Sequence, residues 1–228
     1  MYRTGVRSFF GFLLALLVLA GCSADGYDSG DGRYSYLRAD FVEMHADAGK
    51  AVDYVVTDEG ERLAADPSFT LSWITKPDSV YRALMYYNKI YSESGSACAK
   101  ALSVVQVPVL DIIPLQQVGE VPSDPVTFES AWLSAGGKYL NMCVLLKAGT
   151  TDDSDAMQTI GIVGEQTVTM PDGGSCAVLR FLHDQGGVPE YYSVRKYLSI
   201  RTADIDADAV KIKINTYSGE TEKVINLN

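Results

Sequence analysis

The sequence predicts an all-β protein with two domains that follow an N-terminal export signal. Beyond residue 33, apolar and polar residues alternate in short runs rich in Tyr, Val, Ile and Thr, which is the period-2 pattern of half-buried strands. No stretch between these runs carries the periodicity of a long amphipathic helix. Two prolines and a glycine interrupt the alternation at 116–125 and divide the strands into two sets. Many short strands at this spacing are typical of a β-sandwich or a β-barrel.

The first segment, residues 1–21, has the layout of a secretory signal peptide. A basic start precedes an apolar run that is too short to cross a bilayer permanently. The end of the segment resembles the bacterial lipobox, with Leu19, Ala20, Gly21 and Cys22. In lipoproteins, this cysteine receives a diacylglycerol and the chain is cut before it. An ordinary signal peptide beside an unrelated cysteine is the alternative, and we expect Cys22 to anchor the protein to a membrane through its lipid.

Residues 22–33 contain little besides glycine, serine and aspartate, and this composition predicts a flexible acidic tether. An acidic stretch after the cysteine is associated in some lipoproteins with display on the outer face of the outer membrane. A solvated spacer without such a signal is an equal alternative. We therefore expect a lipid-anchored protein of the outer membrane, either facing the periplasm or exposed at the cell surface.

The first predicted domain covers residues 34–118. Its stretch 80–91 fits a helical face as well as a strand, and the many tyrosines favour the strand. Pro108 predicts an edge or a bend in the last run of this set. The predicted strands of the domain are 34–44, 52–58, 69–75, 80–91 and 101–110.

The second predicted domain covers residues 119–228 and begins with a hairpin. Residues 126–133 and 139–147 read as two strands around the turn 134–138, where glycines suit a positive φ. The cleanest alternation of the chain lies at 210–215. Further short strands are predicted at 159–164, 166–170, 176–183, 191–194, 197–200 and 223–227.

The segment DPVTFESAWLSAGGKYLNMCVLLK (124–147), together with the lipobox and the acidic tether, resembles the NigD-like lipoprotein family. The resemblance continues weakly into 195–214 and covers the chain after the signal peptide, with a divergent first half. It implies an OB-like N-terminal barrel followed by a C-terminal β-sandwich. The shared segment carries no catalytic residues to transfer. The family takes its name from an association with a bacteriocin gene cluster, so the resemblance implies a role in immunity.

The charge balance argues against a nucleic-acid partner. The chain carries a formal net charge of −10 at pH 7, and no cluster of lysines and arginines interrupts the acidic residues. Such a surface repels a phosphate backbone. We therefore expect no nucleic acid among the partners.

The sequence predicts no catalytic residues and no cofactor. The chain has two histidines, His45 and His183, and Asp184 follows the second of them. A triad would also need an activated nucleophile, and no G-x-S-x-G or cysteine-protease pattern is present. Glycine-rich phosphate-binding signatures are absent as well. A cryptic hydrolase, built on His183 or on two distant carboxylates, remains the weakest of the functional alternatives.

Two acidic segments are candidate metal sites, and a solvated turn is the favoured interpretation of both. Asp204, Asp206 and Asp208 alternate as in a calcium loop, but Ala209 and Asn215 occupy the places of the required glycine and glutamate. The second segment is a predicted loop with Asp152, Asp153 and Asp155. We expect no metal site.

Three cysteines remain after Cys22, namely Cys98, Cys143 and Cys176. Their number permits at most one internal disulfide in an oxidising compartment. Two of them lie in apolar, strand-like runs. Buried free thiols are therefore favoured over a disulfide pair.

Clustered tyrosines are the remaining candidates for ligand binding, because aromatic rings bury a large area at low entropic cost. The candidates are Tyr86, Tyr87, Tyr191 and Tyr192, and core packing is the alternative for each. Trp73 and Trp132 are expected to be core anchors. A non-catalytic lipoprotein that binds an unknown envelope protein predicts a broad exposed apolar patch. A glycan-binding module, the alternative, predicts a groove with two or three exposed tyrosines in line.

Overall fold

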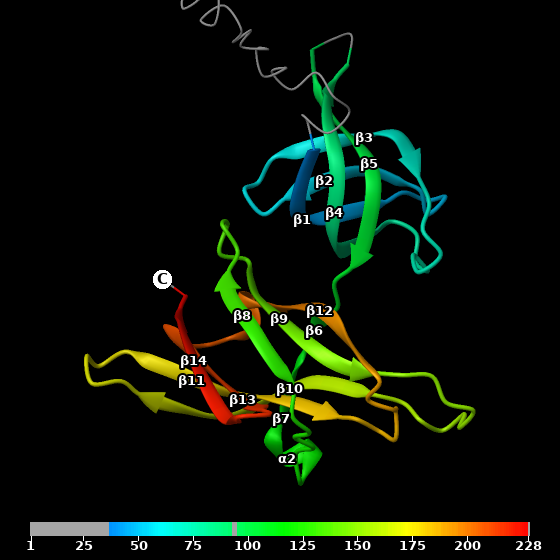
Figure 1. Cartoon of the computed structure of the whole chain (residues 1–228). Helices are drawn as coiled ribbons and strands as arrows, with labels where there is room; N and C mark the ends of the chain where they lie inside the picture. Colours follow the sequence, from blue (N-terminus) through cyan, green and yellow to red (C-terminus); the bar gives the residue numbers. More distant parts are fainter. Residues whose placement is uncertain (1–36, 93–94, 228) are drawn as a thin grey trace, which may run out of the picture. The chain divides into compact units, whose positions relative to one another are not determined.

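The computed structural model of the protein describes residues 37–92 and 95–227 (Figure 1). The predicted signal peptide, lipobox and tether, with Cys22, lie outside the described residues. From Arg38 onward, the chain belongs to one compact unit that is built almost entirely of strands. No helix in the described ranges is long and apolar enough to span a membrane. The predicted all-β fold is confirmed.

The first five strands close into a barrel with the order β1-β2-β3-β5-β4, which confirms the expected OB-like domain. β3 and β5 pair in parallel, whereas β4 and β5 form a long antiparallel hairpin. The strands are β1 (Leu37–Ala46), β2 (Val52–Thr57), β3 (Arg62–Phe69), β4 (Ser79–Tyr91) and β5 (Ala97–Gln106).

Alternate residues of these strands fill the barrel. On β1, Val42, Met44 and Ala46 are fully buried and the residues between them are half-buried, as expected where successive side chains point to opposite faces. Leu63 of β3 and Met85 of β4 are also fully buried in this core. The ambiguous stretch 80–91 forms a strand, which confirms the interpretation drawn from its tyrosines.

A five-stranded and a four-stranded sheet follow the barrel and pack as a sandwich. The five-stranded sheet has the order β14-β13-β11-β10-β7, with β7 (Ile112–Pro114), β10 (Thr159–Thr169), β11 (Ser175–Asp184), β13 (Ala209–Thr216) and β14 (Gly219–Asn226). The four-stranded sheet has the order β6-β12-β9-β8, with β6 (Val109–Leu110), β8 (Thr127–Leu133), β9 (Tyr139–Ala148) and β12 (Tyr192–Arg201). A short helix, α2 (Leu115–Val118), and a 3-10 turn, Thr202–Asp204, complete the described part of the chain.

One apolar core joins the inner faces of the two sheets. Val210, Ile212 and Ile214 of β13 are fully buried, and the residues between them are half-buried. The alternation predicted at 210–215 therefore reflects a strand with one buried face. The predicted hairpin of 126–133 and 139–147 is confirmed as β8 and β9.

The sheets change earlier along the chain than the predicted domain limits of 34–118 and 119–228 imply. β6 already pairs with β12, and β7 pairs with β10, so residues from Val109 onward contribute to the sandwich. Both strands are short, and each adds to the edge of its sheet. The proline-containing segment 116–125 lies within the sandwich, because it connects β7 to β8.

The predicted strands 159–164 and 166–170 are one continuous strand, β10. Its pairing with β11 shifts between Gly164 and Gln166, where a bulge leaves Glu165 unmatched. A bulge bends a strand without ending it. The sequence around Gly164 therefore predicted two strands where the structure has one bent strand.

Candidate functional site

The segment 124–147 that carries the family resemblance builds the junction between barrel and sandwich. In the turn between β8 and β9, the hydroxyl oxygen of Ser134 accepts a hydrogen bond from the Tyr139 N–H at 3.0 Å. A Cβ atom on Gly136 would lie only 2.9 Å from the backbone oxygen of Asp58 in the barrel. This turn therefore needs a glycine for its close approach to the end of β2.

A buried arginine of the barrel, Arg82 on β4, forms the centre of the junction. Its side chain is almost fully buried and makes a two-pronged ion pair with Asp58, with one Nη2–Oδ2 distance of 2.8 Å. The same Nη2 donates to Oδ1 of Asn141 on β9 at 3.2 Å. The guanidinium also lies 4.2 Å from the ring centroid of Tyr139. Arg82 thus pairs with Asp58 inside the barrel and reaches the sandwich through Asn141 and Tyr139.

A second set of contacts lies beside Arg82. The Tyr139 hydroxyl donates to Oε1 of Glu43 on β1 at 2.6 Å, and Nζ of Lys138 lies 2.5 Å from the same oxygen. Phe41 packs edge-on against Trp132, with ring centroids 5.6 Å apart. Trp132, expected to be a core anchor, is half-buried at this junction rather than inside the sandwich core.

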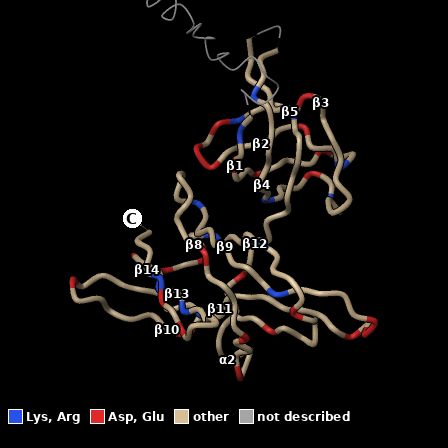
Figure 2. Tube along the Cα trace, in the orientation of Figure 1, with Lys and Arg blue, Asp and Glu red and all other residues tan. Residues whose placement is uncertain are grey.

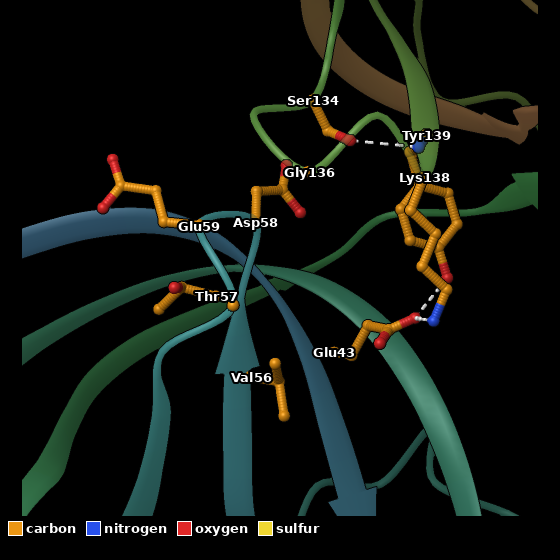
Figure 3. Close-up of a pocket in the computed structure, with 10 residues that line it drawn as sticks. Glu43, Val56, Thr57, Asp58, Glu59, Ser134, Gly136, Lys138 and Tyr139 are labelled. Carbon is orange, nitrogen blue, oxygen red and sulfur yellow. Dashed lines mark hydrogen bonds and ion pairs between the residues drawn. The ribbon is translucent and has the colours of Figure 1, made fainter.

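A pocket of about 200 Å³ opens at this junction (Figure 3). It is lined by Glu43, Val56, Thr57, Asp58, Glu59, Gly60, Ser134, Gly136, Lys138 and Tyr139. Two of its carboxylates are already engaged, Asp58 by Arg82 and Glu43 by Lys138 and Tyr139. The pocket therefore lies beside the polar contacts of Arg82 with Asp58 and of Glu43 with Lys138 and Tyr139, which we call the polar clamp.

The clamp depends on the ionised form of Glu43. Burial raises the pKa of this carboxyl, but the hydrogen bonds from Lys138 and Tyr139 lower it more, so the net pKa lies below its ordinary value of 4.5. A carboxyl whose pKa is lower in the folded state than in the unfolded state stabilises the fold above its unfolded-state pKa. That contribution is lost as the pH falls through the folded-state pKa.

We expect the free energy of unfolding to fall between about pH 5 and about pH 3, in part because Glu43 takes up a proton. Urea denaturation of wild type and Glu43→Gln over this range measures the effect, and the variant should show a smaller pH dependence. Glu59→Gln, on an exposed side chain of the same pocket, is the matched control and should keep the wild-type slope. Equal slopes for wild type and Glu43→Gln would contradict the assignment.

The tyrosines proposed for ligand binding do not act as a group. Tyr86 is 37% exposed on β4, but Tyr87 is 1% exposed, which corrects its assignment as a binding residue. The Tyr87 hydroxyl donates to Oδ2 of Asp40 at 2.7 Å. Burial first, and then this hydrogen bond, raise the pKa of Tyr87 far above its ordinary value. The two tyrosines occupy adjacent positions of one strand, so one points outward when the other fills the core.

Tyr191 and Tyr192 lie where the chain enters β12, and both are exposed, at 76% and 53%. Tyr217 and Met157 are exposed as well, at 50% and 72%. The Tyr217 hydroxyl is 3.5 Å from Oε2 of Glu190, and the Met157 N–H donates to the oxygen of Gly186 at 3.0 Å. We call these four residues, Met157, Tyr191, Tyr192 and Tyr217, the tyrosine–methionine patch.

The two histidines lie in different domains, His45 on β1 and His183 on β11, and no described contact joins them. Nδ1 of His45 is 2.7 Å from Oδ1 of Asp53, and its ring stacks on Tyr54. His183 is 1% exposed, and its Nδ1 donates to the carbonyl oxygen of Asp124 at 3.0 Å. His183 thus acts as a core residue that holds the segment before β8.

The acidic segments form ordinary turns in the structure. Asp208 accepts hydrogen bonds from the backbone and hydroxyl of Ser175, and Asp204 lies 3.7 Å from Arg201. Asp153 accepts the N–H of Asp155 within its own loop. Within residues 37–92 and 95–227, no three His, Cys, Asp or Glu side chains gather as a metal site would require.

Cys98, Cys143 and Cys176 are free and buried, which the apolar context predicted for Cys143 and Cys176. The Cys143 thiol donates to Oε2 of Glu129 at 3.0 Å. Burial and this hydrogen bond raise the pKa of Cys143 to about 12, so the thiol stays protonated at neutral pH.

Several contacts of the candidate site were not predicted from the sequence. Arg82 sits within the ambiguous stretch 80–91, and its charge in an apolar run was a usable signal of a buried ion pair. Met157 and Tyr217 lie in loops distant in sequence from Tyr191. Only the fold places them at one end of the sandwich.

The fold of this chain is similar to that of several solved structures. A NigD-like immunity protein from Bacteroides caccae is 24% identical and superposes with a TM-score of 0.63, over 82% of this chain and 91% of that protein. A protein of unknown function from Bacteroides vulgatus is 18% identical, with a TM-score of 0.60, over 83% of this chain and 90% of the other.

A Bacteroides fragilis protein, provisionally classed as a lipoprotein, is 12% identical with a TM-score of 0.58, over 84% of this chain and 98% of the other. No protein-family model and no curated protein matches the sequence. At these identities the likeness concerns the fold. The chain therefore shares the barrel-and-sandwich fold of a NigD-like immunity protein.

Proposed function

We propose that this chain is a non-catalytic lipoprotein of the cell envelope that binds a protein partner. The observation that carries the proposal is the tyrosine–methionine patch, in which four large side chains are at least half exposed at one end of the sandwich. Large exposed apolar groups that gather in one place are typical of interaction surfaces. The fold shared with an immunity protein supports a role in which binding is itself the activity.

A protein partner is favoured over a glycan by the positions of the tyrosines. Tyr191 and Tyr192 are adjacent at the start of β12 in the sandwich, whereas Tyr86 lies on β4 of the barrel. Tyr87 is buried and offers no ring to a ligand. A row of tyrosines along one groove, which stacking on sugar rings would use, is therefore not formed by the predicted residues. A polypeptide can instead wrap around the end of a sandwich.

We place the protein at the outer membrane, held there by lipid on Cys22. This part rests on the lipobox residues and on the fold shared with the provisional lipoprotein. Metabolic labelling with palmitate in the cell that makes the protein tests it. Cys22→Ala should lose the label and accumulate as the uncleaved precursor, whereas Cys176→Ala should be labelled and processed normally. Normal processing of Cys22→Ala would disprove the anchor.

The interaction is tested by photo-crosslinking of the full chain in its own cells. A photo-reactive phenylalanine derivative in place of Tyr191 should give one discrete protein adduct on irradiation. The same derivative in place of Val224, which is 51% exposed on β14, is the control and should give no such adduct. The proposal fails if position 191 gives no adduct or if both positions give the same adducts.

A further inference from the structure

Building on the proposed function, we infer that the tyrosine–methionine patch accepts a cationic, amphipathic segment of the partner protein. The inference names the chemistry of the partner at that surface. It is carried by two features of the same loops, namely exposed apolar side chains and an excess of carboxylates without counter-ions.

Three segments supply the patch and contact one another at one end of the sandwich, and a fourth, 122–125, joins them because the Gln185 N–H donates to Oδ2 of Asp124 at 2.7 Å. Met157 and Gly186 share a backbone hydrogen bond of 3.0 Å, which joins the loop after β9 to the loop after β11. Gly149 lies so close to Pro189 and Tyr191 that a Cβ atom there would be within 2.9 Å of the tyrosine ring. The turn at Tyr217 reaches the same place through Glu190.

The carboxylates of these segments outnumber the basic groups by six to one. Residues 122–125, 147–158, 184–192 and 216–219 contain one basic residue, Lys147, and the acids Asp124, Asp152, Asp153, Asp155, Asp184 and Glu190. Figure 2 shows acidic residues, in red, at the tip of the loop between β9 and β10. In the described part of the chain, none of these six acids forms an ion pair.

The acids of the five-stranded sheet behave differently. Glu165 is paired with Arg180 and Lys213, and Glu222 is paired with Lys211. Glu165 and Glu222 therefore have counter-ions and, among the described residues, the acids around the patch do not. Burial and the charges of Glu190 and Asp124 raise the pKa of Tyr217, in agreement with a negative potential at the patch.

A partner that fits this surface needs apolar side chains for the patch and positive charges for its rim. Lysine and arginine meet both demands, because their aliphatic stems pack on apolar groups while their charged ends reach carboxylates. Their cationic ends also bind favourably over tyrosine rings. Complementary charge speeds encounter and selects against anionic partners. A cationic segment with one apolar face therefore matches the patch.

The test uses a synthetic helical peptide of lysine and leucine that has one apolar and one basic face. Its binding to the purified full chain is measured by fluorescence anisotropy. We expect saturable binding that weakens at least about tenfold between about 0.05 M and about 0.5 M NaCl. The same peptide with glutamate in place of lysine should not bind. A scrambled peptide of equal composition should bind at least about tenfold more weakly.

Two variants with matched controls locate the site. The double variant Met157→Ser with Tyr191→Ser should weaken peptide binding at least about tenfold, and Tyr91→Ser, which alters an equally exposed tyrosine of the barrel, should not. Peptide binding should also weaken in a triple variant that carries Asp152→Asn, Asp153→Asn and Asp155→Asn. Its control is a triple variant that loses the same charge elsewhere, with Glu59→Gln, Asp172→Asn and Asp206→Asn. Peptide binding by this control should stay near wild type.

Equal losses in the patch variants and their controls would overturn the inference, because attraction would then come from the net charge alone. The protein could instead bind a neutral oligosaccharide. If Tyr191→Ser abolished that binding and the aspartate-to-asparagine variant left it intact, the inference would be overturned in favour of a glycan ligand. A crosslinked partner at position 191 without peptide binding would leave the proposed function standing and refute the cationic partner. Failure of both experiments would refute both.

Discussion

Arg82→Ala is expected to lower the free energy of unfolding by about 3 kcal/mol, because it leaves the half-buried carboxylate of Asp58 without its ion-pair partner and removes one of the two donors to Oδ1 of Asn141. Removing one partner of a buried ion pair is costly, since the remaining charge stays away from water. Urea denaturation followed by tryptophan fluorescence measures the effect. Trp132 lies at the junction and reports on it directly.

Arg195→Ala is the matched control for this prediction. Arg195 also makes a two-pronged pair, with Glu129, but its side chain is 55% exposed. An exposed pair contributes little to stability because water and salt screen its charges, so Arg195→Ala should cost much less than Arg82→Ala. Arg82→Lys should recover little of the loss, because an ammonium cannot reach Asp58, Asn141 and the Tyr139 ring together. If Arg82→Ala and Arg195→Ala lowered the free energy of unfolding by similar amounts, the contacts of Arg82 would not stabilise the junction between barrel and sandwich as proposed.

Gly186→Ala is expected to cost about 3 kcal/mol and to displace the loop that carries Met157. Gly186 has a φ of 54°, and a Cβ atom there would overlap the carbonyl oxygen of Met157. The backbone must move to relieve this overlap, and the hydrogen bond between Met157 and Gly186 is then lost. Thermal unfolding measures the cost, and peptide binding at the tyrosine–methionine patch should fall with it.

The neighbouring residue offers a control with the same backbone strain but without the overlap. Gly187 has a φ of 76°, and a Cβ atom there would meet only the side chain of Ala156, at 3.8 Å. Gly187→Ala should therefore cost about 1 kcal/mol, the strain of a left-handed alanine. If both variants lose the same stability, the contact with Met157 does not decide the loop conformation.

Strand periodicity predicted the strands that bury one face, such as β13, where buried and half-buried residues alternate from Val210 to Asn215. It missed β3 and wrongly predicted a strand at 69–75, most of which is a turn and loop in the structure. The hairpin of β8 and β9 was predictable for a second reason, the glycines of its turn. The bulge in β10 and the position of β6 and β7 were not predictable, because each depends on which strand lies alongside.

The candidate site was predicted much less well than the fold. Tyr86 and Tyr87 are identical in type and adjacent in sequence, yet one is exposed and the other is buried. Which of two adjacent strand residues faces the core depends on the register of the pair, and β4 and β5 shift register between these two tyrosines. Residue type alone therefore could not separate a binding tyrosine from a core tyrosine.

By itself, the sequence determined the all-β class, the two sets of strands, the acidic character and the lipobox pattern, because each follows from local composition or spacing. Tertiary structure alone decided the rest. Arg82 meets Asn141 only when the barrel lies against β9, and the segments of Met157, Tyr191 and Tyr217 meet only at the end of the sandwich. Contacts between residues distant in the chain are set by packing, and no local pattern encodes them.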